Sequence, residues 1–329
     1  MTVESTTAPE LGHGTATRHL IHCPPSWDRY LLEAPGSSEE HFVLAGDIPA
    51  AHPLFSDGPG RLHDPQLLTD MVREIGEFVG HQYFGVPGDR VGLFHRFGLE
   101  LTDLAGWRAG ADRARLLTRI AVAPVNVVGG VPRGLEFRLE AAIDDVVCAA
   151  GSAGLVFLMP VLYRNHVAQS RRALDGSAAP GPSWPVAPAE VGRRSPGDVV
   201  VREAAPVASG PAAGPGPVRL VTWIVPRPAD PVFAGPGGGG LSGLLLEGMR
   251  QSAVLAAART GGIEAGRAVQ DSFEVRFSGY AADDLALRCA TVVQAGRAAA
   301  EVALTVTQNG RPVADARARV IQDYQEQPV

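Results

Sequence analysis

Two stretches of the chain decide its fold: HDPQLLTDMVREIG at 63–76 and GLLLEGMRQSA at 243–253. In both, leucine, methionine and other apolar residues recur at the three- and four-residue spacing of one helix face. The patterns predict one helix over 65–84 and another over 243–259. Each helix has an apolar stripe, so each must be buried against another element of structure.

The residues ahead of each helix are typical of helix starts. Asp64 is a good N-cap and Pro65 suits the first helical position, while Ser242 is the N-cap candidate of the second helix. A glycine-rich run, 235–243, precedes that second helix. Its exposed backbone amides, including that of Gly243, could polarise a carbonyl or hold a phosphate, and a plain flexible loop is an equal alternative.

The secondary structure around the two helices repeats. A strand candidate precedes each helix, at 41–48 and at 218–225, and long strand candidates follow it without a further helix. We expect these later strands at 91–101, 116–128, 135–147 and 155–162, and then at 272–280, 285–293, 298–307 and 313–321. Asn309-Gly310 predicts a hairpin turn, and Gly151 to Gly154 occupies the equivalent place in the first half.

One helix with a run of antiparallel strands predicts an α+β unit, and a curved sheet wrapped around a central helix is the hot-dog arrangement. We therefore expect a tandem double hot-dog, with two unrelated α+β domains as the alternative. The predicted boundaries are a disordered N-terminus at 1–17, unit 1 at 18–174, a Pro/Gly/Ala-rich linker at 175–217 and unit 2 at 218–329. One ordered-looking island, 191–201, lies inside this linker.

Composition argues against several classes of function. The net charge of −6 indicates neither a nucleic-acid groove nor an anionic membrane surface, and no apolar run is long enough to span a bilayer. The chain contains no lysine, which removes Schiff-base chemistry and the P-loop lysine. Cys23, Cys148 and Cys289 lack the spacing of a disulfide framework or a zinc site. With a polar N-terminus that is not a signal peptide, this predicts a cytoplasmic protein without metal or cofactor.

The candidate chemistry lies on the polar faces of the helices. Asp70 and Arg73 in the first helix match Glu247 and Arg250 in the second, and residues three apart share one helix face. A solvated ion pair is the simplest interpretation of either pair alone. The recurrence favours a functional pair, in which a partly desolvated carboxylate with a raised pKa is a general base and the guanidinium binds an anion.

Histidines are confined to the first half. All nine lie at or before His166, so chemistry in the second half must use carboxylates, arginines, hydroxyls or backbone groups. His63, beside Asp64, and His52, which begins HPLF, precede the first helix. Either could serve a dehydratase-type reaction, although a capping or packing role is the simpler interpretation.

Four segments resemble the A-factor biosynthesis (AfsA) hot-dog family: HLIH at 19–22, HDPQLLTDMVREIG at 63–76, VGRRSPGDVV at 191–200 and DPVF…GLLLEGMRQSA at 230–253. They span most of the chain in the family's order, and the third is rather specific because no generic structural reason explains it. The resemblance implies a tandem hot-dog related to fatty-acid dehydratases. Such proteins transfer a β-ketoacyl group from an acyl carrier protein to the hydroxyl of dihydroxyacetone phosphate, on the way to a butenolide and a γ-butyrolactone or furan signal.

Carried over by motif, the resemblance implies that Glu247 and Arg250 are catalytic, with Asp70 by its position in the first helix. This chain departs from the family pattern at two places. Asp70 stands where the family usually has Glu, and GGGGLSG replaces an Asp-His-x-Pro-Gly stretch ahead of the second helix. A different acceptor, or a role in another natural-product pathway, is therefore an open alternative.

We thus predict an acyltransferase whose partners are a β-ketoacyl thioester of an acyl carrier protein or coenzyme A and a small phosphorylated hydroxyl acceptor. Glu247 would take the proton of the acceptor hydroxyl, and Arg250 would hold the phosphate or the oxyanion. The substrate-binding candidates are Arg73, His63, Ser242 and Gly243. Two other classes stay open: a hot-dog dehydratase or thioesterase, and a non-catalytic ligand-binding or carrier-docking relative.

Overall fold

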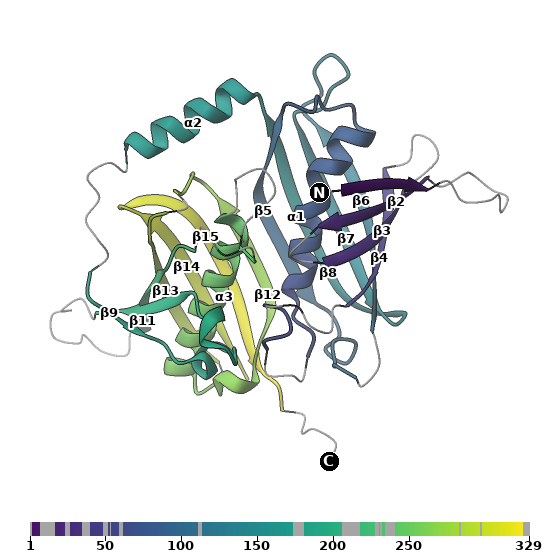
Figure 1. Ribbon diagram of the computed structural model, residues 1–329. Helices are drawn as coiled ribbons and strands as arrows, with labels where there is room; N and C mark the ends of the chain where they lie inside the picture. The colour runs from purple at the N-terminus through teal and green to yellow at the C-terminus, as the bar shows by residue number, and fades with distance from the viewer. Residues whose placement is uncertain are drawn as a thin grey trace. The chain divides into compact units, whose positions relative to one another are not determined.

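The computed structural model describes residues 2–6, 17–23, 27–34, 40–48, 52, 54–58, 62–110, 114–173, 181–205, 218–227, 230, 232–233, 241–282, 284–296 and 298–324. They form two compact units, Met1–Ser56 with Gly60–Tyr163, and Asp57–Pro59 with Arg164–Val329. In each unit a long helix lies along an antiparallel sheet (Figure 1). The α+β class predicted from the sequence is confirmed.

Five strands of each unit follow the same order. The strands of the first unit are β1 (Thr2–Thr6), β2 (Thr17–Cys23), β3 (Trp27–Ala34), β4 (His41–Asp47), β5 (Val91–Leu101), β6 (Arg115–Val125), β7 (Gly134–Ile143) and β8 (Val146–Leu158). Those of the second are β9 (Ser183–Pro185), β10 (Val201–Ala204), β11 (Val218–Ile224), β12 (Ala268–Phe277), β13 (Leu287–Ala295), β14 (Ala299–Gln308) and β15 (Arg311–Gln322). The order β4-β6-β7-β8-β5 in the first unit matches β11-β13-β14-β15-β12 in the second, as expected for the repeat predicted from the sequence.

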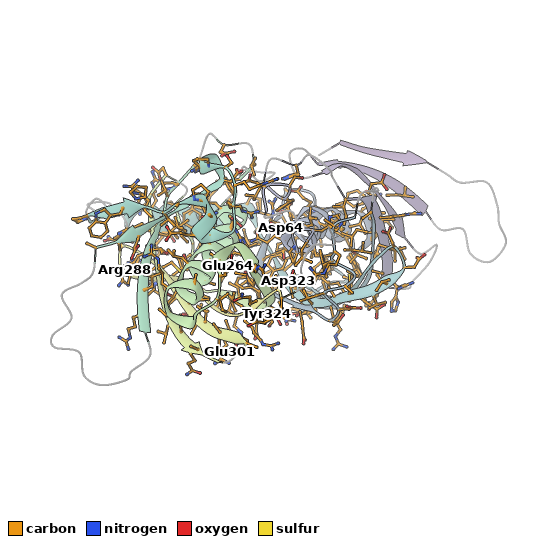
Figure 2. The ribbon with its side chains drawn as sticks, turned by 90° about the horizontal axis from the view of Figure 1, so that it is seen from below. Asp64, Glu264, Arg288, Glu301, Asp323 and Tyr324 are labelled. Atoms are coloured by element: carbon orange, nitrogen blue, oxygen red, sulfur yellow. The ribbon has the colours of Figure 1, made fainter. Side chains whose placement is uncertain are left out.

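Helix α1 (Gln66–Tyr83) begins one residue later than predicted, with Pro65 rather than Asp64 at the N-cap, and it is buried as its sequence predicts. Asp64, labelled in Figure 2, accepts the amide hydrogen of Gln66 on Oδ1 at 3.0 Å. The predicted apolar stripe is buried throughout: Leu67, Leu68, Met71, Val72, Ile75 and Val79. Burial of each such side chain contributes roughly 1.5–3 kcal/mol, so the stripe holds the helix on its sheet.

Helix α3 (Leu241–Gly261) is buried on more than its predicted stripe. It packs against strands β11 to β15 and also against the 3₁₀ helix η1 (Pro188–Val191). From residue 244 to residue 257, every residue except Arg250 is buried. The polar residues Glu247, Gln251 and Ser252 are therefore core residues and cannot form a solvated helix face.

The stretch predicted as a linker is folded in its central part. Residues 181–205 contain β9, η1, η2 (Pro196–Asp198) and β10, and β10 pairs with both β9 and β11. The second unit therefore includes residues well before the expected boundary at 218. The proline content of this stretch does not distinguish a linker from folded structure, because proline suits the first position of 3₁₀ turns as well as linkers.

The N-terminal segment also differs from its prediction. Residues 2–6 form β1, which pairs with β2, within the range expected to be disordered. Residues 7–16, 174–180 and 206–217 lie outside the described ranges. Cys148 and Cys289 are free and buried, in agreement with their expected role as small apolar residues.

One hairpin turn is predicted correctly and its counterpart is not. Asn309 and Gly310 join β14 to β15 with φ angles of 50° and 74°. In the first unit the turn is Asp144-Asp145, with φ angles of 46° and 67°, rather than the glycines at 151–154. Gly151 lies within β8 instead. A Cβ at this position would come within 2.6 Å of the Gly98 carbonyl oxygen, so the close approach of the strands requires glycine.

Helix α2 (Pro160–Arg172) is absent from the sequence prediction, which extends a strand to 162. None of its residues is buried, so the apolar periodicity that reveals α1 does not exist here. None of the helices formed by the described residues is long and apolar enough to cross a bilayer.

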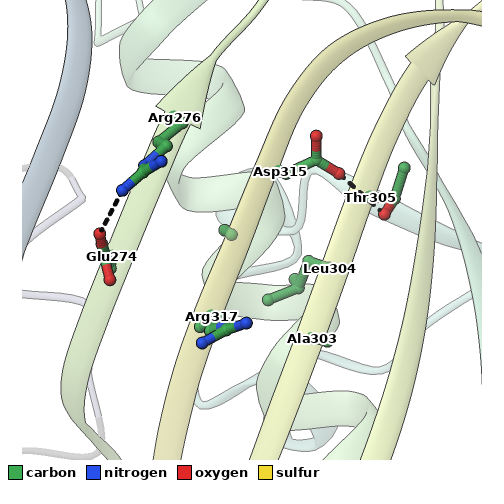
Figure 3. A pocket seen from close by; sticks show the side chains of 8 residues that line it. Glu274, Arg276, Ala303, Leu304, Thr305, Asp315 and Arg317 are labelled. Atoms are coloured by element: carbon green, nitrogen blue, oxygen red, sulfur yellow. Dashed lines mark hydrogen bonds and ion pairs between the residues drawn. The ribbon is translucent and has the colours of Figure 1, made fainter.

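The face of the second sheet that turns away from α3 is charged. A hollow of about 380 Å³ lies over β12, β14 and β15 (Figure 3). Arg276 lies 3.7 Å from Glu274 across its rim, and Thr305 Oγ1 donates to Asp315 Oδ1 at 3.0 Å. Opposite charges on alternating strand positions are typical of a solvated sheet face.

Candidate active site

Glu247 lies at the centre of a buried hydrogen-bond network on α3. Arg193 donates from Nε and Nη2 to its two carboxylate oxygens, at 2.9 and 2.8 Å. Arg250 donates from Nε and Nη2 to the same two oxygens, each at 2.8 Å, and Gln251 adds a donor at 2.6 Å. The exposed fraction of the side chain is 0% for Glu247, 1% for Arg193 and 12% for Arg250. Two guanidinium groups therefore enclose the carboxylate.

These contacts reverse the pKa shift expected for Glu247. Burial by itself raises the pKa of this carboxyl, but the charges and hydrogen bonds of Arg193 and Arg250 outweigh burial and hold the pKa well below its usual range. The prediction of a raised pKa is wrong because the helix pattern shows only one of the two guanidinium groups. A carboxylate that stays ionised and fully hydrogen-bonded is a poor proton acceptor.

The segment 191–200, VGRRSPGDVV, folds over the polar face of α3 and supplies Arg193. Gly192 turns the chain after η1 with a φ of 65°, a conformation that favours glycine. The amide of Val200 donates to Gln251 Oε1 at 2.9 Å, which fixes the far end of the segment to α3. The segment without a generic structural explanation in the sequence therefore has one in the fold, since it closes over Glu247.

Asp57 and Asp198 form a carboxyl pair beside this segment. Asp57 accepts hydrogen bonds from the backbone amides of Arg194 and Ser195, at distances from 2.9 to 3.1 Å. Partial burial, and then the hydrogen bond and the charge of Asp57, raise the pKa of Asp198 from 3.8 to about 6. The folded state therefore holds this proton more tightly than the unfolded chain does. Its contribution to stability is complete below pH 3.8 and is lost as pH rises through about 6.

Asp198→Asn is expected to raise the melting temperature at about pH 8 by about 2–4 °C, equivalent to about 1 kcal/mol. The amide keeps a hydrogen bond to Asp57 without requiring a proton, so the electrostatic penalty at alkaline pH disappears. Thermal unfolding followed by circular dichroism at about pH 5 and about pH 8 measures the effect. The control is Asp89→Asn on an exposed loop. Equal shifts at both pH values would contradict the assignment of the raised pKa to Asp198.

Asp70 occupies the corresponding position on α1 and is open on one side. Arg73 donates to Asp70 Oδ1 from Nε at 3.2 Å and from Nη2 at 2.5 Å, and Nη2 also donates to Glu74 at 2.8 Å. Asp70 Oδ2 is buried, yet it accepts no hydrogen bond from the residues that the structure describes. A buried acceptor without a donor is unfavourable by about 1–3 kcal/mol, so this oxygen is poised to accept a hydrogen bond from a ligand.

The clusters on the two helices match in register and differ in charge. Positions 70, 73 and 74 of α1 correspond to 247, 250 and 251 of α3. In the α1 cluster two carboxylates bind one guanidinium, whereas in the α3 cluster two guanidiniums bind one carboxylate, and Arg193 also interacts with the charge of Asp198. Within the described part of the chain, no group of three or more His, Cys, Asp or Glu side chains is arranged to hold a metal ion.

The two candidate histidines have different surroundings. His63 Nε2 is buried without a hydrogen-bond partner among the described residues, and burial lowers the pKa of His63 despite the opposing charge of Asp144. His52 instead caps a turn: its Nδ1 accepts the amide hydrogens of Leu54 and Phe55, both at 3.1 Å. The capping interpretation therefore holds for His52, while His63 stays a candidate ligand of substrate.

Ser242 lies inside the first turn of α3 rather than ahead of it, because the helix begins at Leu241. Its side chain and the residues 234–240 lie outside what the structure describes. Gly243 is half-buried, and a Cβ built on it meets no atom within 4 Å, so its backbone borders open space. The substrate-binding roles of Ser242 and Gly243 stay predictions.

Sequence reasoning missed three members of the α3 network: Arg193, Gln251 and Asp57. Gln251 carries a signal, because it follows Arg250 at the register that Glu74 has in the first helix. Arg193 lies in a segment that resembles the family but carries no role there. Asp57 has no sequence signal, since its partners lie more than a hundred residues later in the chain.

A long helix along an antiparallel sheet, repeated with the same strand order and with an acid–arginine pair on each helix, defines a class of repeated α+β proteins. Within that class, the profile of the A-factor biosynthesis hotdog domain (AfsA) matches residues 10–159 and again residues 174–321. The chain therefore belongs to the AfsA hotdog family.

Two relatives share the name 2-oxo-3-(phosphooxy)propyl 3-oxoalkanoate synthase. The protein of Streptomyces virginiae is 27% identical over 188 residues, which are 57% of this chain and 62% of its own length. That of Streptomyces coelicolor is 27% identical over 186 residues, 55% of this chain and 57% of its own. The matches thus span about three fifths of these relatives. A candidate oleoyl thioesterase from Lactobacillus plantarum has a solved structure with 8% identity and a TM-score of 0.53, covering 89% of this chain and 99% of its own, and shares the fold alone.

Proposed function

We propose that this protein is an acyltransferase that moves a β-ketoacyl group from an acyl thioester to the hydroxyl of a phosphorylated acceptor such as dihydroxyacetone phosphate. The name of the two relatives describes an ester between a 3-oxoalkanoate and a phosphorylated three-carbon alcohol. In this chain the proposal rests on the matched acid–arginine clusters of α1 and α3. The ester would condense internally toward a butenolide, a precursor of γ-butyrolactone-type signals in the cytoplasm.

The finer architecture belongs to the same proposal. We take the chain to be a tandem of two hot-dog units. The family profile matches once in each half, and the two sheets share one strand order. The acyl donor would be the thioester of an acyl carrier protein or of coenzyme A.

We assign base catalysis to Asp70 rather than to Glu247. Asp70 Oδ2 has no donor among the described residues, and Arg73 holds Oδ1 so that the carboxylate keeps one orientation. Asp70 takes the proton as the acceptor hydroxyl oxygen attacks the thioester carbonyl carbon. The carbon–sulfur bond then breaks, and the leaving thiolate receives that proton from Asp70.

Anion binding is assigned to the α3 cluster. Arg193 and Arg250 both bind the Glu247 carboxylate, and Arg250, with 12% of its side chain exposed, is the less buried of the two. Arg250 would bind an anionic group of a substrate. Glu247 would act as a positioning residue that keeps Arg193 and Arg250 in place.

Mass spectrometry of the purified protein with a β-ketoacyl thioester tests the function. With dihydroxyacetone phosphate present, we expect a phosphorylated ester or its butenolide, and without it we expect the thioester to persist. Hydrolysis of the thioester without the acceptor would support a thioesterase. Loss of water from the acyl group would support a dehydratase. An unchanged thioester with every phosphorylated hydroxyl acceptor tried would support a ligand-binding role.

One observation favours the dehydratase alternative as the second candidate. His63 has a buried Nε2 without a described partner and a lowered pKa, so it is neutral near pH 7 and able to take a proton. His63→Gln separates the two readings. Loss of all turnover with a 3-hydroxyacyl thioester would support the dehydratase, whereas unchanged acyl transfer supports the base assigned to Asp70.

A further inference from the structure

Helix α2 presents an exposed surface that the chemistry of the two clusters does not use. Among its thirteen residues there are three arginines and no acidic residue, in a chain whose net charge is −6. The helix therefore has a charge opposite to that of the protein as a whole. Such a local reversal needs a physical reason, because like charges gathered on one short helix repel each other.

The outward face of α2 combines positive charge with apolar side chains. Val161, Arg164, Ala168 and Arg172 follow one another at spacings of three and four residues, so they form one stripe, and all four are exposed. Val161 is 57% exposed, and Leu162 beside it is 51% exposed. Large apolar side chains next to arginines are typical of the centre and rim of a protein interface.

Helix α2 is held at defined points along its length. Both carboxylate oxygens of Asp284 accept hydrogen bonds from the guanidinium of Arg171, and the ring of His166 meets that of Tyr280 edge-on at 6.1 Å. The loop that carries Tyr280 and Asp284 is itself fixed by Gln308. The Gln308 amide exchanges hydrogen bonds of 2.7 and 2.9 Å with the backbone of Ala282. The stripe is thus a fixed surface and not part of a flexible connection.

We propose that the stripe of Val161, Arg164, Ala168 and Arg172 is the docking surface for an acidic, helical carrier protein that brings the acyl chain as a thioester. The proposal rests on the proposed acyl transfer, and it identifies the donor as protein-bound rather than as a free coenzyme A thioester. Arginines at the rim attract the acidic partner and orient it, and the apolar residues exclude water at the centre. No acidic side chain of α2 itself opposes such a partner.

The test compares two donors with one pair of variants. The double variant Arg164→Glu/Arg172→Glu is assayed with a 3-oxoacyl group on a type II fatty-acid acyl carrier protein and with the same group on a small pantetheine thioester. The value of kcat/KM with the carrier should fall about tenfold or more, since two attractive charges become repulsive, while that with the pantetheine thioester stays unchanged. The control is Arg311→Glu, an exposed arginine at the start of β15.

Two other results with active protein overturn the proposal. Unchanged turnover with the carrier, or an equal loss with both donors, removes the docking role. If the native protein turns over neither donor, the proposed function fails, and docking is then decided by isothermal titration with the carrier protein alone. A tenfold weaker Kd in the double variant supports docking, and an unchanged Kd refutes it. The native protein could instead sediment with phosphatidylglycerol vesicles while the double variant does not. That result would show that α2 binds an anionic membrane surface rather than a carrier protein.

Discussion

Asp70→Asn should lower kcat for acyl transfer by about 10²–10⁴-fold, the usual contribution of a positioned general base. The substitution removes the proton-accepting oxygen but keeps the shape of the side chain on α1. The asparagine oxygen can still accept from Arg73, and Arg73 keeps its ion pair with Glu74, so the melting temperature should stay nearly constant. Steady-state kinetics with a β-ketoacyl thioester and dihydroxyacetone phosphate measure the effect.

A conservative variant provides the matched control. Asp70→Glu restores a carboxylate at the same helix position, so it should recover a substantial part of the lost turnover. If the asparagine variant retained native kcat, or if glutamate gave no recovery over asparagine, the proton acceptor would have to be sought elsewhere, first at His63. A large fall in melting temperature would instead show a structural role for Asp70.

Glu247→Gln should destabilise the second unit by about 3–5 kcal/mol, because it leaves two buried guanidinium groups without their counter-charge. The side chain is 0% exposed and accepts hydrogen bonds from Arg193, Arg250 and Gln251, so no solvent compensates the loss. Urea unfolding of the native and variant proteins gives the difference in the free energy of unfolding. The native contribution is complete above the ordinary glutamate pKa of 4.5 and erodes only as pH falls below it, since the pKa of Glu247 is lowered.

The double variant Glu247→Gln/Arg193→Gln separates charge from packing. The single variant leaves the guanidiniums of Arg193 and Arg250 without the Glu247 carboxylate. The second substitution removes one of these two positive charges, so the double variant should be more stable than Glu247→Gln alone. A Glu247→Gln protein with native stability but no turnover would return the role of general base to Glu247. The opposite result, a destabilised variant that keeps measurable kcat at low temperature but has a raised KM for the phosphorylated acceptor, is what the proposed positioning role requires.

The helices and the repeat could be predicted because their signals are local or periodic. The stripe at Leu67, Leu68 and Met71 and the turn at Asn309-Gly310 depend on residues close together in the chain. The turn between β7 and β8 was predicted at the wrong place because glycine is the commonest turn residue. Two aspartates form the turn, whereas Gly151 allows a close approach of strands. Helix α2 has no buried face and so leaves no apolar pattern.

The candidate site was predicted in its positions but not in its electrostatics. Register alone placed Asp70 beside Arg73 and Glu247 beside Arg250, and both ion pairs exist. Whether such an acid is a base or a permanent anion depends on what packs on it from elsewhere in the chain. Arg193 lies 54 residues before Glu247 in the chain. Its charge and hydrogen bonds help to lower the pKa of Glu247, which burial alone would raise. No periodicity within a helix contains that information.

The place of Asp57 in the second unit bears on how the protein can be taken apart. This residue precedes α1 in the chain, yet it belongs to the same compact unit as α3 and binds the amides of Arg194 and Ser195. A recombinant fragment that starts at residue 164 therefore lacks an acceptor that its own backbone requires. No single proteolytic nick releases the two halves as complete pieces. Production of the second unit on its own therefore needs the stretch at 57–59 as well as the residues from 164 onward.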